Sequence, residues 1–197
     1  MNPRDRFVDR YKEGTTPWVH ENPDFNLIEI VENWPIHPCK VLELGCGTGV
    51  EAMWLSKQGF EVTAIDGSSI AIDIAKKAAS SADTSCNFMV SDFITDNFEG
   101  EYDFIFDRGF FHSFDDEEER SFYASKVASL LSPRGMWLTL VANSDSPPRD
   151  SGPPPRSAKN IIDAIEPHFK LLTLTVSYFG NNQDNPPKIW VCLMRNR

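Results

Sequence analysis

The sequence is short of basic residues: 19 Lys and Arg stand against 29 Asp and Glu, giving a formal net charge of −10. An acidic surface without a basic stripe repels phosphate backbones, so we expect no nucleic-acid partner. Long apolar runs are also absent, and the longest have only the length of a strand, so no transmembrane helix is expected. Residues 1 to 15 lack an apolar stretch, and no signal peptide is predicted. We therefore expect a cytoplasmic protein without a membrane partner.

The four cysteines have neither the spacing of a metal site nor that of a disulfide framework. They are Cys39, Cys46, Cys86 and Cys192. No activating base is evident near any of them, so we predict no metal centre and no catalytic cysteine. With 197 residues, 41% of them hydrophobic, the chain is long enough to bury the core of one ordinary domain. The sequence is silent about oligomeric state.

A glycine-rich segment follows the first apolar strand: residues 41 to 49 read VLELGCGTG. A helix is predicted from Val50, and a second apolar run ends at Asp66. A strand leading into glycines, then a helix, then a strand that ends in a carboxylate is typical of a nucleoside-binding βαβ unit. The glycines let the backbone approach a ligand, and Asp66 can accept hydrogen bonds from both ribose hydroxyls.

The spacing of these glycines indicates which nucleoside is bound. Gly45, Gly47 and Gly49 form Gly-x-Gly-x-Gly, whereas the dinucleotide fingerprint is Gly-x-Gly-x-x-Gly. Glu43 precedes the first glycine by two residues, where a carboxylate repels phosphate and attracts a cation. S-adenosyl-L-methionine has no phosphate and carries a sulfonium and an ammonium group, so we predict it as the cofactor. A dehydrogenase is the weakest alternative.

Four stretches resemble, in order, the cofactor motifs of class I S-adenosylmethionine-dependent methyltransferases: VLELGCGTG, VTAID, SDF and YDFIFDRGFFHSF. The match runs from about residue 39 to 142. Thr15-Thr16-Pro17-Trp18 and Asp107-Arg108-Gly109 look like the branch of thiopurine, thiol/halide and tellurite-resistance methyltransferases. The resemblance implies an enzyme that methylates a small-molecule acceptor.

The pattern along the chain predicts five strand–helix units followed by a β-hairpin. Strands are expected at about 39–44, 61–65, 86–91, 102–106, 136–142, 169–178 and 189–194. This is the layout of a class I methyltransferase: an α/β, Rossmann-like, doubly wound sheet of seven mostly parallel strands with an antiparallel C-terminal hairpin strand. We expect residues 1–37 to form an N-terminal cap segment over the cofactor site and residues 38–197 a single methyltransferase domain.

Capping residues predict where the helices begin. These are Asn26 with Glu29, Ser68, Asp115 with Glu118, and Ser157. Apolar spacing predicts which side chains face the core: Met53 and Trp54 in the helix after the glycines, Ala71, Ile74, Ala75 and Ala78 in the next, and Tyr123, Val127, Leu130 and Leu131 in the helix after Asp115.

The predicted cofactor site lies where successive strands end, because the carboxyl ends of parallel strands form the ligand-binding edge of an open sheet. Asp92 is expected to accept from the adenine amino group while Phe93 packs on the ring. In the family resembled, residues around the glycines and after the fourth strand meet the methionine moiety, and a tryptophan closes over the cofactor. The predicted set is Trp18, Glu43, Leu44, Gly45, Cys46, Gly47, Asp66, Gly67, Ser68, Asp92, Phe93, Asp107 and Gly109.

Arg108 and His112 are the candidate catalytic residues. Arg108 is expected to pair with an anionic acceptor or a thiolate, and the alternative is a salt bridge to a nearby acid. His112 is a candidate general base, and the alternative is a histidine bonded to backbone. A thiol hardly needs a base, since its pKa of about 8.5 leaves usable thiolate at neutral pH.

Two further groups of residues have both a functional and a structural interpretation. Phe110, Phe111 and Phe114 either line an acceptor pocket or, as the spacing favours, pack in the core. Arg149 and Arg156, in the proline-rich loop 143–156, either contact anions or, as we favour, keep that loop soluble. The leading hypothesis is methylation of a thiol or another soft nucleophile. The alternatives are a carboxylate, hydroxyl or amine acceptor, or a cofactor-binding subunit without catalysis.

Overall fold

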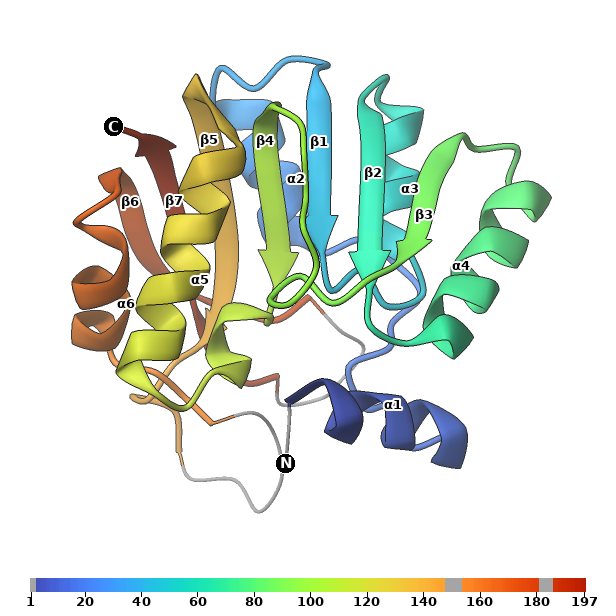
Figure 1. Cartoon of the computed structure of the whole chain (residues 1–197), viewed down its shortest axis with the longest axis horizontal. Helices are drawn as coiled ribbons and strands as arrows, with labels where there is room; N and C mark the ends of the chain where they lie inside the picture. Colours follow the sequence, from blue (N-terminus) through green and yellow to red (C-terminus); the bar gives the residue numbers. More distant parts are fainter. Residues whose placement is uncertain (1–2, 148–153, 181–185) are drawn as a thin grey trace.

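Seven strands form one sheet in the computed structural model, which describes residues 3–147, 154–180 and 186–197 (Figure 1). The order across the sheet is β3 (Cys86–Val90), β2 (Glu61–Asp66), β1 (Lys40–Leu44), β4 (Tyr102–Arg108), β5 (Leu131–Ala142), β7 (Lys188–Asn196) and β6 (Phe169–Tyr178). Strands β1 to β5 are parallel, and β7 is antiparallel to both β5 and β6. The predicted doubly wound sheet with an antiparallel C-terminal strand is confirmed.

Helices cover both faces of this sheet, and each face has its own buried cluster. Residues of α2 (Phe25–Asn33), α3 (Val50–Lys57) and α4 (Ser69–Ser81) belong to one cluster. Those of α5 (Glu117–Leu130) and α6 (Ala158–Ile165) belong to the other. In Figure 1, α5 lies in front of the sheet and α2 behind it.

Most side chains of the central strands are apolar because both faces of these strands are buried. In β1, Val41 belongs to one cluster while Leu42 and Leu44 belong to the other, and each of the three is fully buried. Alternation along the strand therefore sends neighbouring side chains to opposite cores. Glu43 in β1 and Thr139 in β5 are buried polar exceptions within the strands.

Two predicted helix starts are confirmed and two are wrong by one or two residues. Ser68 and Ser157 cap α4 and α6. Asp24, not Asn26, caps α2 by accepting from the backbone N–H of Asn26. Asp116, not Asp115, caps α5. In both wrong cases two polar residues able to cap lie close together in sequence, and local spacing does not choose between them.

The predicted core faces of the helices are partly corrected. Ile74 is 43% exposed, and the buried side chains of α4 are Ala71, Ile72, Ala75 and Ala79. Met53 and Trp54 are only half-buried, and Ala52 and Leu55 provide the buried face of α3. The buried face of α5 and Leu131 are as predicted. Strand β5 begins at residue 131 rather than 136, because Leu131 already pairs with Tyr102.

A helix that the sequence analysis did not predict, α1 (Pro3–Glu13), lies across the carboxyl ends of the central strands (Figure 1). It is followed by an irregular segment that leads to α2. This arrangement gives the N-terminal residues a position over the edge where the cofactor site is expected. Among the helices of the described residues, none is long and apolar enough to span a membrane.

Candidate active site at the carboxyl edge of the sheet

The loop between β1 and α3 approaches two aromatic side chains so closely that it requires glycine. Gly45 and Gly47 have φ angles of 69° and 53°, in the left-handed region. A Cβ on Gly45 would lie 2.8 Å from Cδ2 of Phe110, and a Cβ on Gly47 would lie 2.9 Å from the hydroxyl oxygen of Tyr11. The sequence predicts that these glycines let a ligand approach the backbone. In the structure they also leave room for the side chains of Phe110 and Tyr11.

Asp66, at the end of β2, fixes this loop. Its Oδ2 accepts from the backbone N–H of Gly47 at 2.9 Å, and its Oδ1 accepts from the N–H of Ser68 at 2.8 Å. Gly67 lies between them in the turn to α4. Burial raises the pKa of Asp66, and these two hydrogen bonds oppose the rise. One carboxylate thus joins the glycine loop to the start of α4, next to the position predicted for a ribose.

Glu43 places a buried carboxylate beneath the same loop. It is 2% exposed. Burial raises its pKa well above the usual range, and the neighbouring Glu51 and Asp66 raise it further. Among the described residues, Oε2 of Glu43 has no hydrogen-bond partner. An uncompensated carboxylate oxygen of this kind fits a cationic ligand and does not fit a phosphate.

Leu44 and Cys46 flank Gly45, and both side chains are buried. The predicted contacts of these two residues with the cofactor stay predictions. Burial raises the pKa of the Cys46 thiol well above its usual range, and the nearby Glu43 and Asp66 add to the rise. The thiolate is the reactive form of cysteine, so this thiol is a poor nucleophile.

Asp107, at the end of β4, lies inside the protein and organises the turn that follows. Its carboxylate is fully buried and accepts five hydrogen bonds, from the backbone N–H groups of Phe110 and Phe111 and from the side chains of Tyr123, Trp137 and Thr139. Burial raises its pKa to about 6, against the effect of these bonds. The carboxylate of Asp107 is enclosed, and its contact with the cofactor stays a prediction.

His112 follows in the short helix η1 (Phe111–Ser113) and is also buried. Its Nδ1 accepts from the backbone N–H of Ala142 at 3.0 Å, so the neutral ring carries its proton on Nε2. The ring packs under Gly109, where a Cβ would lie 2.7 Å from Cε1 of His112. The basic nitrogen is therefore already used by backbone, which is the alternative stated above for this residue. The general-base role stays a prediction.

Arg108 forms a buried ion pair with the N-terminal segment. Its Nε donates to Oδ2 of Asp24 at 2.8 Å, and its Nη2 donates to the carbonyl of Gly180 at 3.2 Å. The guanidinium lies over the ring of Phe179, 4.7 Å from its centroid. Arg108 is 10% exposed and Asp24 fully buried, so the salt bridge weighed as the alternative is present. A contact of Arg108 with the acceptor stays a prediction.

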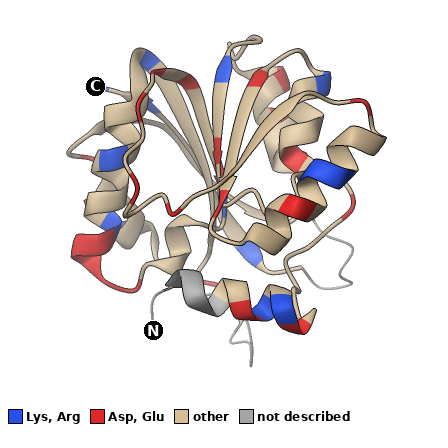
Figure 2. Ribbon diagram, turned by 45° about the vertical axis from the view of Figure 1, so that its right-hand side comes forward, with Lys and Arg blue, Asp and Glu red and all other residues tan. Residues whose placement is uncertain are grey.

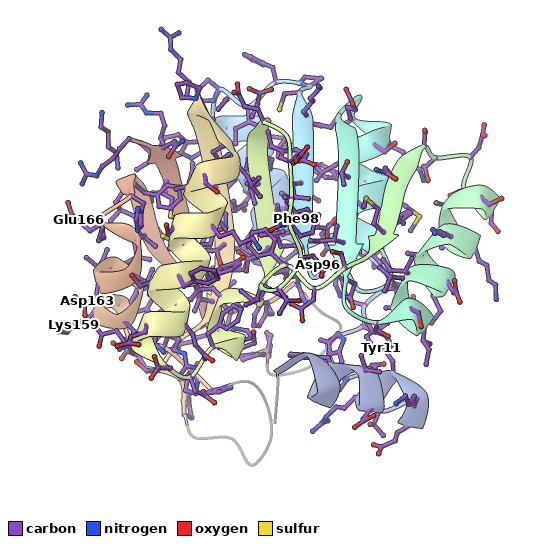
Figure 3. All side chains as sticks on the ribbon, viewed as in Figure 1. Tyr11, Asp96, Phe98, Lys159, Asp163 and Glu166 are labelled. Atoms are coloured by element: carbon purple, nitrogen blue, oxygen red, sulfur yellow. The ribbon has the colours of Figure 1, made fainter. Side chains whose placement is uncertain are left out.

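Trp18 reaches the glycine loop through another residue. Its Nε1 donates to the hydroxyl oxygen of Tyr11 at 3.2 Å, and its ring meets those of Phe7 and Tyr11 edge to face. Figure 3 shows Tyr11 pointing from α1 toward the strand ends. Sequence reasoning missed Tyr11. The available signal was the i, i+4 spacing of Phe7 and Tyr11, which is typical of one helix face.

Asp92 and Phe93 follow β3. Oδ1 of Asp92 accepts from the backbone N–H of Ile94, which forms a tight turn. Phe93 is 1% exposed and packs against Phe98, Phe110 and Tyr123. Its ring therefore lies in a buried aromatic cluster, and the adenine contact of Asp92 and Phe93 stays a prediction.

The remaining candidates are structural in this arrangement. Phe111 and Phe114 are buried in the core, as the spacing favoured, and Phe110 is half-buried. Arg156 is buried rather than solvating a loop, because its Nη2 donates to the carbonyls of His112 and Phe114 and to Asp115. Arg149 lies outside the described residues.

The charges at this edge are mainly negative. Figure 2 shows acidic residues in the middle of the sheet and at the start of α5. In the described ranges, no group of three or more His, Cys, Asp or Glu side chains is arranged to hold a metal ion. The site consists of the glycine loop, Asp66 and Glu43 below it, and Tyr11 with Trp18 above it.

Comparison with known proteins finds similarity to methyltransferases. The family model of thiopurine S-methyltransferase matches residues 3–186. A probable thiol methyltransferase 2 of Arabidopsis thaliana is 30% identical over 146 residues, which are 73% of this chain and 63% of that protein. A 2-heptyl-1-hydroxyquinolin-4(1H)-one methyltransferase of Mycobacteroides abscessus is 27% identical over 85% of this chain and 74% of that protein.

Solved structures agree in fold. A structure on the conversion of a disulfide bond into a thioacetal group during echinomycin biosynthesis has a TM-score of 0.83 at 22% identity, covering 98% of this chain and 91% of that one. The 1,6-didemethyltoxoflavin-N1-methyltransferase of Burkholderia thailandensis has a TM-score of 0.77 at 20% identity, covering 98% and 86%. The resemblance to this methyltransferase branch is confirmed: the chain belongs to the thiopurine S-methyltransferase family.

Proposed function

We propose that this chain transfers a methyl group from S-adenosyl-L-methionine to a small-molecule acceptor. The observation that carries the proposal is the buried Glu43 carboxylate, with an oxygen unpaired among the described residues, beneath a glycine loop that Asp66 holds. Methyltransferases of this family use S-adenosyl-L-methionine. When bound, that cofactor supplies an electrophilic methyl group on a sulfonium.

The chain's own residues bind and orient in this proposal. A cationic ligand beside Glu43 would favour the charged form of this carboxyl against the effect of burial, and Gly45 and Gly47 let the backbone come close to the ligand. Asp66 offers oxygen acceptors at the ribose position while holding the loop. Trp18 and Tyr11 cover the edge and exclude water, which strengthens electrostatic attraction there. Alignment and exclusion of water are the main requirements of an in-line displacement.

The favoured acceptor is a thiol or another soft nucleophile. His112 supports this acceptor class, because its basic nitrogen already accepts from the backbone N–H of Ala142. An acceptor that ionises by itself needs no base, and a thiol with a pKa of about 8.5 meets that condition. The relative from Arabidopsis thaliana is named as a probable thiol methyltransferase.

The second candidate acceptor is a hydroxyl, carboxylate or amine of a small metabolite. The relative from Mycobacteroides abscessus, named for a hydroxyquinolinone, favours this class. A cofactor-binding subunit without catalysis is the third reading. Release of S-adenosylhomocysteine with a panel of thiol, hydroxyl, carboxylate and amine acceptors separates the three. Turnover with thiols alone supports the proposal, and tight cofactor binding without turnover on any acceptor supports the third reading.

We also propose a cytoplasmic location and no nucleic-acid partner. All four cysteines are free in the structure, as a reducing compartment would leave them. The net charge of −10 disfavours binding to phosphate backbones. Cell fractionation with an antibody against the chain, and gel-shift assays with DNA and RNA at low salt, test these two statements.

A further inference from the structure

His20 ties the N-terminal segment to α3. Its Nδ1 lies 2.9 Å from the backbone carbonyl oxygen of Trp18, and its Nε2 lies 2.6 Å from Oε1 of Glu51. The two side chains are 11% and 4% exposed. The sequence analysis did not single out His20, since its partner is 31 residues away in the chain.

The geometry of this contact requires a proton. A carbonyl oxygen only accepts, so Nδ1 of His20 carries hydrogen. If the ring were neutral, Nε2 would then present a lone pair to a carboxylate oxygen at 2.6 Å. Only the imidazolium donates from both nitrogens, which makes it the form that suits the closed contact.

The surroundings keep Glu51 an acceptor. Its Oε1 also receives the backbone N–H of Asp24 at 3.3 Å, and Nε of Arg108 lies 3.9 Å away. The carboxyl group of Glu43 also lies close enough to Glu51 for the two to interact electrostatically. The hydrogen bond and the charge of Glu51 raise the pKa of His20, while burial and Arg108 lower it, and the net direction is upward.

The segment that His20 holds includes Trp18, which contacts Tyr11 over the predicted cofactor site. Trp18, whose carbonyl receives the Nδ1 hydrogen of His20, donates from its indole to the hydroxyl of Tyr11. That hydroxyl lies over Gly47. Three successive contacts therefore connect the charge on His20 to the glycine loop.

We propose that His20 is a positioning residue whose imidazolium, clamped between Trp18 and Glu51, holds the N-terminal segment over the cofactor site and makes cofactor retention depend on pH. This inference rests on the proposed function, because it concerns the same cofactor. It assigns to His20 no contact with the reacting atoms.

The direction of the pH effect follows from proton linkage. The closed segment binds a proton that the open segment releases. Its stabilisation is fully present below the ordinary histidine pKa of about 6.5 and is lost as pH rises through the raised pKa of His20. Affinity for S-adenosyl-L-methionine should therefore fall toward alkaline pH, with KM rising and kcat changing little.

The test is calorimetric titration of the full chain with S-adenosyl-L-methionine between about pH 6 and about pH 9, together with hydrogen exchange of residues 15–24. For the wild type we expect about tenfold weaker binding and faster exchange, corrected for intrinsic rates, at the alkaline end. His20→Gln should bind weakly at both ends. His37→Gln, which changes an exposed histidine, should keep the wild-type profile.

Glu51→Gln provides a second variant, because a glutamine amide can donate to neutral His20 and leave the segment closed. We expect this variant to lose the pH dependence while retaining affinity. A wild-type affinity that does not change with pH, or a His20→Gln profile equal to that of the wild type, would overturn the inference. Absence of cofactor binding at every pH would instead defeat the proposed function, and the exchange measurement would still test the clamp.

Discussion

The hydroxyl oxygen of Tyr11 lies 2.9 Å from the point that a Cβ on Gly47 would occupy. Helix α1 and the glycine loop are far apart in sequence, yet one covers the other without room for a methyl group. Gly47 thus has two requirements, a left-handed backbone and an empty space above it.

Gly47→Ala should weaken binding of S-adenosyl-L-methionine about tenfold and lower stability by about 1–2 kcal/mol, the usual cost of a left-handed backbone in a non-glycine residue. Gly14→Ala is the matched control, because Gly14 has a φ of 68° and nothing within 4 Å of its Cβ position. It should show a similar loss of stability and nearly unchanged binding. Thermal melts give the stability of the two variants, and titrations give their affinity for S-adenosyl-L-methionine. Equal affinities of Gly47→Ala and Gly14→Ala would contradict the role of the Tyr11 contact.

Tyr11→Phe should weaken cofactor binding about fivefold, because one hydrogen bond contributes on the order of 1 kcal/mol and Trp18 loses its acceptor. The melting temperature should change little. Tyr178→Phe, at an exposed position in β6, serves as the control for the loss of a hydroxyl. If the cofactor affinity of Tyr11→Phe equals that of Tyr178→Phe, the phenol of Tyr11 has no part in the site.

Asp107→Asn should destabilise the fold by about 2–4 kcal/mol, because the new amide group would direct hydrogen-bond donors at donors in a fully buried site. Asp103→Asn changes an exposed position of the same strand and should cost less than about 1 kcal/mol. Denaturant unfolding of both variants measures the difference. A small loss of stability in Asp107→Asn together with loss of cofactor binding would instead support the direct contact of Asp107 with the cofactor that the sequence predicts.

Arg108→Ala should lower stability by about 3–5 kcal/mol, since it leaves the buried Asp24 carboxylate without its cation. The double variant Arg108→Ala with Asp24→Asn should recover part of that loss. Urea unfolding of the four members of this cycle gives the coupling energy. Arg108→Lys with unchanged stability and a strongly reduced kcat would show that the arginine acts on the acceptor after all.

His112→Gln should leave turnover within about twofold of the wild type across about pH 6 to 9, because glutamine can also accept from the backbone of Ala142. The pH–rate profile of the variant is the measurement. Loss of an ascending limb near neutral pH would identify His112 as a general base.

The strand ends were predictable from sequence because their signals are local. The carboxyl edge of a parallel sheet is indicated within about twenty residues, by the glycines after one buried strand and by Asp66 at the end of the next. The seven strands follow from the periodicity of the apolar residues, and their arrangement in one sheet from the layout of class I methyltransferases. The resemblance to the methyltransferase branch depends on these local segments, and it was confirmed by the family match.

The contacts that give each residue its surroundings were not predictable. Arg108 meets Asp24 across 84 positions, and Thr139 reaches Asp107 across 32. A single sequence shows the charges but not their pairing. Helix α1 was not predicted because most of its residues are charged and only Phe7 and Tyr11 show the i, i+4 spacing of one helix face. Wrong caps at Asn26 and Asp115 have a simpler origin, since other residues able to cap lie within two positions.

Calorimetric titration of the chain with S-adenosyl-L-methionine tests the central claim most directly. The account predicts saturable heat at one-to-one stoichiometry, strong weakening in Asp66→Ala, and no heat with a nicotinamide dinucleotide. Absence of binding heat with millimolar S-adenosyl-L-methionine, or binding of the dinucleotide instead, would contradict the proposed cofactor.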